Sequence, residues 1–90
     1  MIRVGLLGTG RIGSLHAENV ASHRESTLDV VADIDNDSAN NLAAQFGAFV
    51  KSADELISDP NIDAILIATS THTHSDFIEK ASSAGKAILC

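Results

Sequence analysis

The sequence has 90 residues, of which 44% are hydrophobic and 20% charged, and this is the composition of one small globular domain. Twelve acidic residues against six scattered basic ones give a net charge of −6, so the chain lacks the basic patch that a nucleic-acid partner requires. No apolar run reaches the roughly 20 residues of a membrane span, and one cysteine cannot form an internal disulfide, so we expect a cytoplasmic protein that binds no membrane.

The N-terminal stretch predicts a strand, a glycine-rich turn and a helix. The apolar run Ile2–Leu7 is typical of a buried strand, and Gly8, Gly10 and Gly13 follow it in the pattern G-x-G-x-x-G. In this context Gly8 allows a tight turn, Gly10 lets a pyrophosphate approach the backbone, and Gly13 lets the helix lie close to the strand. The helix is expected over Arg11–Ser22, and its first-turn N–H groups favour an anion by roughly 0.3–1 kcal/mol. The side chains available to face the sheet are Ile12, Leu15, Ala17 and Val20.

The second apolar run is followed by an acidic residue where a dinucleotide site needs one. Residues 28–32 predict a strand, and Asp33 comes next, 20 positions after Gly13. A carboxylate about 20 residues beyond the glycines accepts hydrogen bonds from the adenosine ribose in such sites. The alternative is a glycine-rich turn and an acidic loop that bind nothing. The spacing favours the dinucleotide site.

The rest of the chain continues the alternation of strand and helix. Asp35 is suited to cap a helix, Gly47 to end one, and the stretch from Ser52 to Glu55 has the form of a capping box. Residues 64–68 are apolar without interruption, as expected of a strand that is buried on both faces. The expected helices lie at about 36–46, 53–58 and from a cap within 73–76 to Gly85, and the expected strands at 48–50, 63–68 and 87–90.

This alternation predicts an α/β fold, a doubly wound parallel sheet of the Rossmann type with strand order 3-2-1-4-5. The sequence stops after the fifth strand, so we interpret residues 1–90 as a partial dinucleotide-binding domain. Ligands of such sheets bind at the carboxyl ends of the strands, where the strand order reverses. The glycine turn, Asp33 and the polar stretch 69–74 should therefore meet in one crevice between the first and fourth strands.

The residues around Asp33 favour NAD over NADP. A 2′-phosphate beside Asp33 would bring two like charges together, at a cost of about 4 kcal/mol for a separation of ~4 Å and an effective dielectric constant near 20. Ile34 offers an apolar wall for adenine, and neither Asp35 nor Asn36 supplies a cation for that phosphate. We expect NAD to be the cofactor.

Other polar residues near the expected crevice each have two interpretations. Thr69, Ser70 and Thr71 either satisfy loop backbone or contact the cofactor, and their place at the switch point favours contact. Arg11 is either a solvated helix residue or a partner of the pyrophosphate. His74 is either solvated in the first turn of its helix or close to the nicotinamide.

Two histidines, His72 and His74, raise the question of a metal site. Residues two positions apart point to opposite sides of an extended chain, and no nearby cysteine or acid completes a tetrahedral set. We therefore expect no metal.

With these residues placed, the chain resembles the N-terminal part of the glucose–fructose oxidoreductase and inositol dehydrogenase family, above all its inositol 2-dehydrogenase-like members. The resemblance covers the whole chain and is more specific than the glycines alone. It implies hydride transfer between NAD(P) and a hydroxyl carbon of a cyclic polyol or sugar, which would be the substrate of the full-length protein. It rests on residues 5–13 with His16 and Ala17 after them, and on residues 31–33, 68–74 and 84–90.

The resemblance also implies roles for single residues. In the family the fifth strand runs on into Glu-Lys-Pro, whose lysine orients substrate and relays a proton, and further acid/base residues lie in a second domain. This sequence stops at Cys90, and Lys86 precedes the strand, so no residue is assigned a catalytic role and the 90 residues alone are expected to be inactive. By resemblance, the backbone at Gly10, Arg11 and Ile12 would hold the pyrophosphate, Asp33 the ribose, and Ser70 and His74 the nicotinamide region.

Two other functions stay open on the sequence. A non-catalytic NAD-sensing or regulatory module would carry the same motifs. A methyltransferase that uses S-adenosylmethionine also has a glycine-rich first loop and an acid after its second strand, but residues 69–72 do not resemble the acidic or Asn-Pro-Pro-aromatic loop it needs. In the complete fold a sixth strand would flank the fifth, so the strand at 87–90 is expected to present an unpaired apolar edge, and we expect self-association through it.

Overall fold

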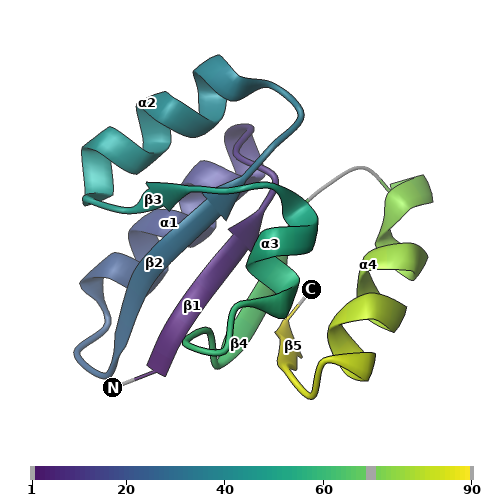
Figure 1. Cartoon of the computed structure of the whole chain (residues 1–90). Coiled ribbons are helices and arrows are strands. Elements are labelled where there is room, and N and C mark those ends of the chain that lie inside the picture. The colour runs from purple at the N-terminus through teal and green to yellow at the C-terminus, as the bar shows by residue number, and fades with distance from the viewer. Residues whose placement is uncertain (1, 69–70, 90) are drawn as a thin grey trace.

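The computed structural model describes residues 2–68 and 71–89, and it shows one parallel sheet with helices on both faces (Figure 1). Strand and helix alternate from the first element to the last, as the sequence predicts. The elements are β1 (Ile2–Leu7), α1 (Arg11–Ser22), β2 (Ser26–Ala32), α2 (Asn36–Phe46), β3 (Phe49–Val50), α3 (Ala53–Ser58), β4 (Ala64–Ile67), α4 (Thr71–Ser83) and β5 (Ala87–Leu89).

The strands lie in the order β3-β2-β1-β4-β5, and every neighbouring pair is parallel, which confirms the predicted Rossmann order. β1 is the central strand, and its last residue, Leu7, pairs with Ala32 of β2 on one side and Ile67 of β4 on the other. Because the three strands run the same way, their carboxyl ends meet at one edge of the sheet. The loops that follow β1 and β2 therefore begin side by side.

Two hydrophobic clusters fill the two faces of the sheet. Successive side chains of a strand point to opposite faces, so Leu6 and Leu66 lie on the face covered by α1 and α2. Leu7 and Ile65 lie on the other face with Leu56 of α3, and this face is also covered by α4 (Figure 1). All four residues of β4 are buried, which explains why its sequence has no polar position.

Helix α1 faces the sheet with fewer large side chains than the sequence suggested. Ala17 is fully buried and Val20 packs against the first cluster, as expected, but Ile12 is 63% exposed and Leu15 is 57% exposed, so the prediction that they face the sheet is wrong. The close contact of Gly13 with the turn after β1 fixes the rotation of the helix. Residues four and seven positions after Gly13 then face the sheet, and Ile12 and Leu15 fall outside that stripe.

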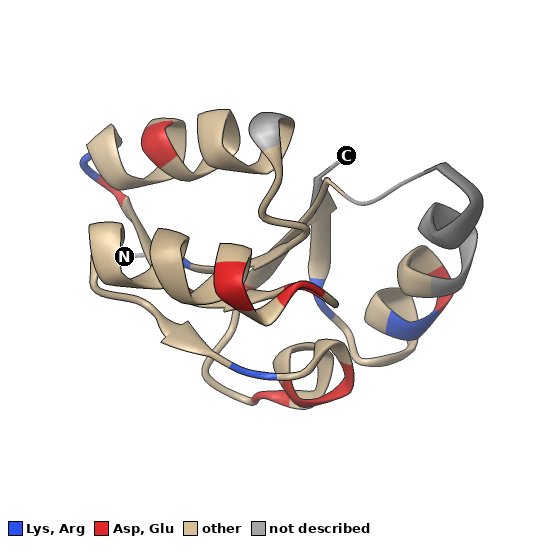
Figure 2. Ribbon diagram, turned by 90° about the horizontal axis from the view of Figure 1, so that it is seen from above, with Lys and Arg blue, Asp and Glu red and all other residues tan. Residues whose placement is uncertain are grey.

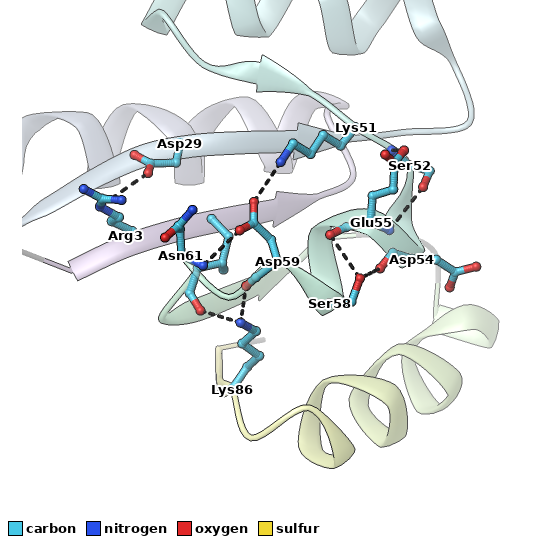
Figure 3. A network of polar contacts seen from close by, with 11 residues as sticks. Arg3, Asp29, Lys51, Ser52, Asp54, Glu55, Ser58, Asp59, Asn61 and Lys86 are labelled. Atoms are coloured by element: carbon cyan, nitrogen blue, oxygen red, sulfur yellow. Dashed lines mark hydrogen bonds and ion pairs between the residues drawn. The ribbon is translucent and has the colours of Figure 1, made fainter.

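Side chains cap the starts of α2 and α3 as predicted. The Asp35 carboxylate accepts hydrogen bonds from the backbone N–H groups of Asp37 and Ser38. At α3, the Ser52 hydroxyl accepts from the N–H of Glu55, and the Glu55 carboxylate accepts from the N–H of Ser52 (Figure 3). These reciprocal bonds satisfy two donors that a helix otherwise leaves unpaired.

Two lysines fasten the loop between α3 and β4. The Lys51 Nζ lies 2.8 Å from the Asp59 carboxylate, and the Lys86 Nζ donates to the carbonyl oxygens of Asp59 and Ile62, the latter at 2.7 Å (Figure 3). Lys86 immediately precedes β5 and Ile62 lies just before β4, so this contact is at the amino ends of the two strands. Lys86 is therefore remote from the carboxyl ends and has a structural role.

Some element boundaries differ from the predicted ones. β2 begins at Ser26, because residues 26–28 extend the ladder with β1. α4 begins at Thr71 rather than at a cap within 73–76, so Thr71 belongs to a helix and not to a loop. Within the described part of the chain, no helix has the length and apolar character to cross a membrane. The predicted site residues Thr69 and Ser70, and Cys90 of the last strand, lie outside the described residues.

The basic side chains do not gather on one element among the described residues. Figure 2 shows Lys and Arg at separate places along the ribbon, with Asp and Glu between them. The sequence carries a net charge of −6. An anion that binds to such a surface depends on backbone N–H groups more than on cationic side chains.

Candidate functional site

A crevice of about 810 Å³ opens at the carboxyl ends of the strands. Its walls come from the turn after β1, the end of β2 and the segment that leads from β3 into α3, and Phe77 of α4 lies on the far side. Gly8, Gly10, Asp33 and Ile34 all line it. Four of the predicted site residues are therefore brought together by the reversal of strand order beside β1.

The three glycines of the turn have different structural requirements. Gly8 has a φ of 98°, a left-handed conformation that other residues rarely adopt. A Cβ at Gly13 would lie 2.1 Å from the carbonyl oxygen of Gly8, which no side chain can tolerate. Gly10 has an ordinary φ of −72°, and a Cβ there would have no protein atom within 4 Å. The fold explains Gly8 and Gly13, whereas the packing of the protein does not require a glycine at position 10.

The start of α1 lacks the side-chain cap that α2 and α3 have. Its N-cap is Gly10, so no side chain accepts a hydrogen bond from the first turn, and no acidic residue stands in that turn. The first N–H groups of a helix have no partner inside the helix, and they carry the positive end of its dipole. This helix start therefore presents backbone donors beside the crevice, where an anionic group can accept from them.

Asp33 is held at the end of β2 by a set of hydrogen bonds. Its Oδ2 accepts from the backbone N–H of Thr9 at 2.7 Å and from the Thr9 hydroxyl at 2.8 Å. Its Oδ1 accepts from the N–H of Asp35 at 3.0 Å. A carboxylate offers about four acceptor positions, so three are used by the protein and one remains on Oδ1.

The same bonds set the charge of the Asp33 carboxylate. Partial burial alone would raise the pKa of Asp33, but hydrogen bonds from the backbone N–H groups of Asp35 and Thr9 and from the Thr9 hydroxyl, with a smaller contribution from the nearby N–H of Ile34, outweigh it and lower that pKa below its usual value. The carboxylate therefore keeps its negative charge well into acidic solution. A fixed anion at this position accepts from hydroxyl groups and repels phosphate.

The remaining predicted site residues are placed less fully. Ile34 is fully exposed next to Asp33 and offers its apolar side chain to the crevice. Ile12 is also exposed, so its side chain contributes nothing to the core and only its backbone N–H belongs to the helix start. The side chains of Arg11, Thr71 and His74 lie outside the described residues, although the backbone at these three positions is helical.

Thr9 is a residue that the sequence did not bring to notice. It occupies a variable position of the G-x-G-x-x-G pattern, yet it is only 5% exposed. Among the described residues, Thr9 is the one polar residue that is buried. Its partner, Asp33, is 24 positions away, so the contact depends on β1 and β2 being neighbours. The only local signal is a hydroxyl between two glycines, which is too weak to predict a partner.

The described residues form no metal centre. Among the side chains that the structure describes, no three of His, Cys, Asp or Glu gather closely enough to hold an ion. The side chains of His72 and His74 lie outside the described residues, so the sequence argument about them stays a prediction.

Comparison with protein families gives one match over nearly the whole chain. Residues 2–90 match the model of a family described as an oxidoreductase family with an NAD-binding Rossmann fold.

Individual relatives are similar over the same range. The chain is 43% identical over 89 residues to an inositol 2-dehydrogenase of Rhizobium meliloti, covering 99% of this chain and 27% of the relative. A myo-inositol dehydrogenase from Corynebacterium glutamicum has a similar structure, with 38% identity and a TM-score of 0.94 over 100% of this chain and 27% of the other. A myo-inositol dehydrogenase from Lactobacillus casei, in complex with NAD(H) and myo-inositol, has 28% identity and a TM-score of 0.93, covering 98% and 27%. The chain thus spans 27% of the length of these relatives.

Proposed function

This chain belongs to the oxidoreductase family with an NAD-binding Rossmann fold, and we propose that it supplies the nucleotide-binding part of a dehydrogenase that acts on a cyclic polyol or sugar. The observation that carries the proposal is the bare backbone at Gly10, which lies at an uncapped helix start and lines the same crevice as the Asp33 carboxylate. The substrate class is supported by the inositol dehydrogenases to which the chain is similar.

The described residues fit a dinucleotide in three ways. The backbone at Gly10, Arg11 and Ile12 would hold the pyrophosphate, because its N–H groups have no side-chain cap. Asp33 would accept from a ribose hydroxyl through Oδ1, and Ile34 would pack against adenine. We propose that Ser70 and His74 lie near the nicotinamide, on the strength of the resemblance, and that Thr69 and Thr71 contact the cofactor because of their place at the switch point.

The chemistry that the nucleotide supplies is hydride acceptance, in which an alcohol carbon loses a hydride to the nicotinamide and becomes a carbonyl carbon as its hydroxyl proton leaves. We propose that no residue of this chain takes that proton. Among the ionisable side chains that line the described crevice, Asp33 is held by Thr9, Lys51 is paired with Asp59, and Glu55 caps α3. Each already has a structural partner, so their role is to bind and to position.

The choice between NAD and NADP tests the proposed function. We expect isothermal titration of the chain to give a Kd for NAD at least about 10-fold lower than for NADP, because Asp33 repels a 2′-phosphate. Asp33→Asn removes the charge but keeps the size of the side chain, so it should reduce the difference between the Kd for NAD and the Kd for NADP. Equal or tighter binding of NADP by the native chain would contradict the preference, and binding of neither nucleotide would contradict the function.

We also propose that the chain is cytoplasmic.

We propose in addition that the chain self-associates through β5. Within the described sheet, β5 pairs only with β4, so its other edge offers unpaired N–H and C=O groups. Light scattering over a range of concentrations should show a mass that rises above that of one chain. A strict monomer at the highest concentration would contradict it.

A further inference from the structure

We propose that Thr9 is a positioning residue for sugar recognition. Its hydrogen bonds to one oxygen of the Asp33 carboxylate orient the other oxygen toward the ribose of the bound nucleotide. This inference rests on the proposed function, since it needs a ribose in the crevice. It goes beyond that function in assigning part of the selectivity to a residue that contacts Asp33 rather than the ligand.

The contacts divide the two carboxylate oxygens unequally. Oδ2 accepts two hydrogen bonds, both from Thr9, at 2.7 Å from its backbone nitrogen and 2.8 Å from its hydroxyl. Oδ1 accepts one from the N–H of Asp35 and so keeps one acceptor position. Two bonds to one oxygen and one to the other fix the rotation of the carboxylate plane. The free position on Oδ1 therefore has a defined direction before a ligand arrives.

The burial of Thr9 shows that its hydroxyl is committed to this contact. Thr9 is 5% exposed, and a buried hydroxyl without a partner would be costly. Its bond to Asp33 satisfies it, and among the described residues no buried side-chain polar atom is left without a partner. Hydrogen bonds to a charged acceptor are stronger than those between neutral groups, so the bond from Thr9 to the Asp33 carboxylate is a strong one.

Geometry also separates Thr9 from the neighbouring glycines. Gly8 and Gly10 line the crevice, whereas Thr9 between them is not part of its lining and turns toward the end of β2. A role in direct phosphate contact is therefore left to the glycine backbone. Thr9 acts through Asp33.

The test compares two probes on the native chain and on two variants. ADP carries the pyrophosphate and the ribose hydroxyls, and 2′,3′-dideoxy-ADP lacks only those hydroxyls. Thr9→Val keeps the shape and the backbone N–H but removes the hydroxyl. We expect it to weaken ADP binding about 10-fold, the size of one charge-assisted hydrogen bond, and to leave dideoxy-ADP binding unchanged. Thr9→Ser restores the hydroxyl and should keep the native preference for ADP.

The outcomes separate this inference from the proposed function. If native chain binds ADP and prefers it to dideoxy-ADP, but Thr9→Val keeps the same preference, the inference is wrong and the proposed function stands. Equal weakening of both probes by Thr9→Val would assign Thr9 to the turn rather than to the sugar, and would also overturn it. Absence of binding by the native chain contradicts both. Should thermal melting show that Thr9→Val does not fold, Thr9→Ala replaces it in the same comparison with Thr9→Ser.

Discussion

Replacing Gly10 with valine should weaken NAD binding by at least about 100-fold while changing the free energy of unfolding by no more than about 1 kcal/mol. The φ of Gly10 suits any residue, and a Cβ there meets no protein atom within 4 Å, so the folded chain can accept the side chain. The same side chain would stand over the uncapped start of α1, between its N–H groups and the pyrophosphate. Titration calorimetry measures the affinity, and urea unfolding measures the stability.

The control for this variant is another substitution at the edge of the crevice. Ile34→Val changes an exposed side chain beside Asp33 by one methylene and leaves the helix start untouched. It should alter the Kd for NAD by no more than about fourfold, the effect of removing one methylene group from water. If Gly10→Val binds NAD as tightly as the native chain, the pyrophosphate does not lie against this backbone, and the assignment of Gly10 fails.

Replacing Gly13 with alanine should destabilise the folded chain by about 3 kcal/mol or more. The added Cβ would lie 2.1 Å from the carbonyl oxygen and 2.9 Å from the carbonyl carbon of Gly8, and backbone atoms cannot rotate away as a side chain can. Alanine has a helix propensity more favourable than that of glycine by about 1 kcal/mol. The loss of stability would therefore occur although the new residue favours the helix. Urea unfolding followed by circular dichroism gives the change.

A substitution on the solvent side of the same helix separates the two effects. Asn19→Ala improves helix propensity at an exposed position of α1 and should leave stability the same or raise it by a few tenths of a kcal/mol. If Gly13→Ala were as stable as Asn19→Ala, helix α1 would not pack against the turn as closely as described. Together with Gly10→Val, these variants assign one glycine to the fold and another to the ligand.

The sequence was sufficient for the fold because its signals are local. The uninterrupted apolar run of β4 reflects burial on both faces, and Asp35 and Ser52 cap the helices that follow them. These features depend on neighbours within a few positions. The order of the strands then follows from the alternation of strand and helix, and the structure confirms it.

The errors and omissions concern contacts between distant parts of the chain. Ile12 and Leu15 were expected against the sheet because they are large and apolar, but the contact between Gly13 and Gly8 rotates the helix so that both are exposed. Thr9 was overlooked because its partner, Asp33, is reached only after β1 and β2 have paired. The spacing of apolar residues therefore cannot predict which side of a helix faces the sheet when that side is determined by the close packing of a glycine.

The hydrogen bonds from Lys86 to the carbonyl oxygens of Asp59 and Ile62 hold β5 in register with β4. A strand of three residues has few ladder bonds to prevent it from slipping along β4, and a slip by one residue would swing Ile88 away from the cluster it joins. Acetylation of this amine would remove its charge and weaken the contact, so the position of β5 is sensitive to a chemical modification at the end of the sheet opposite the crevice.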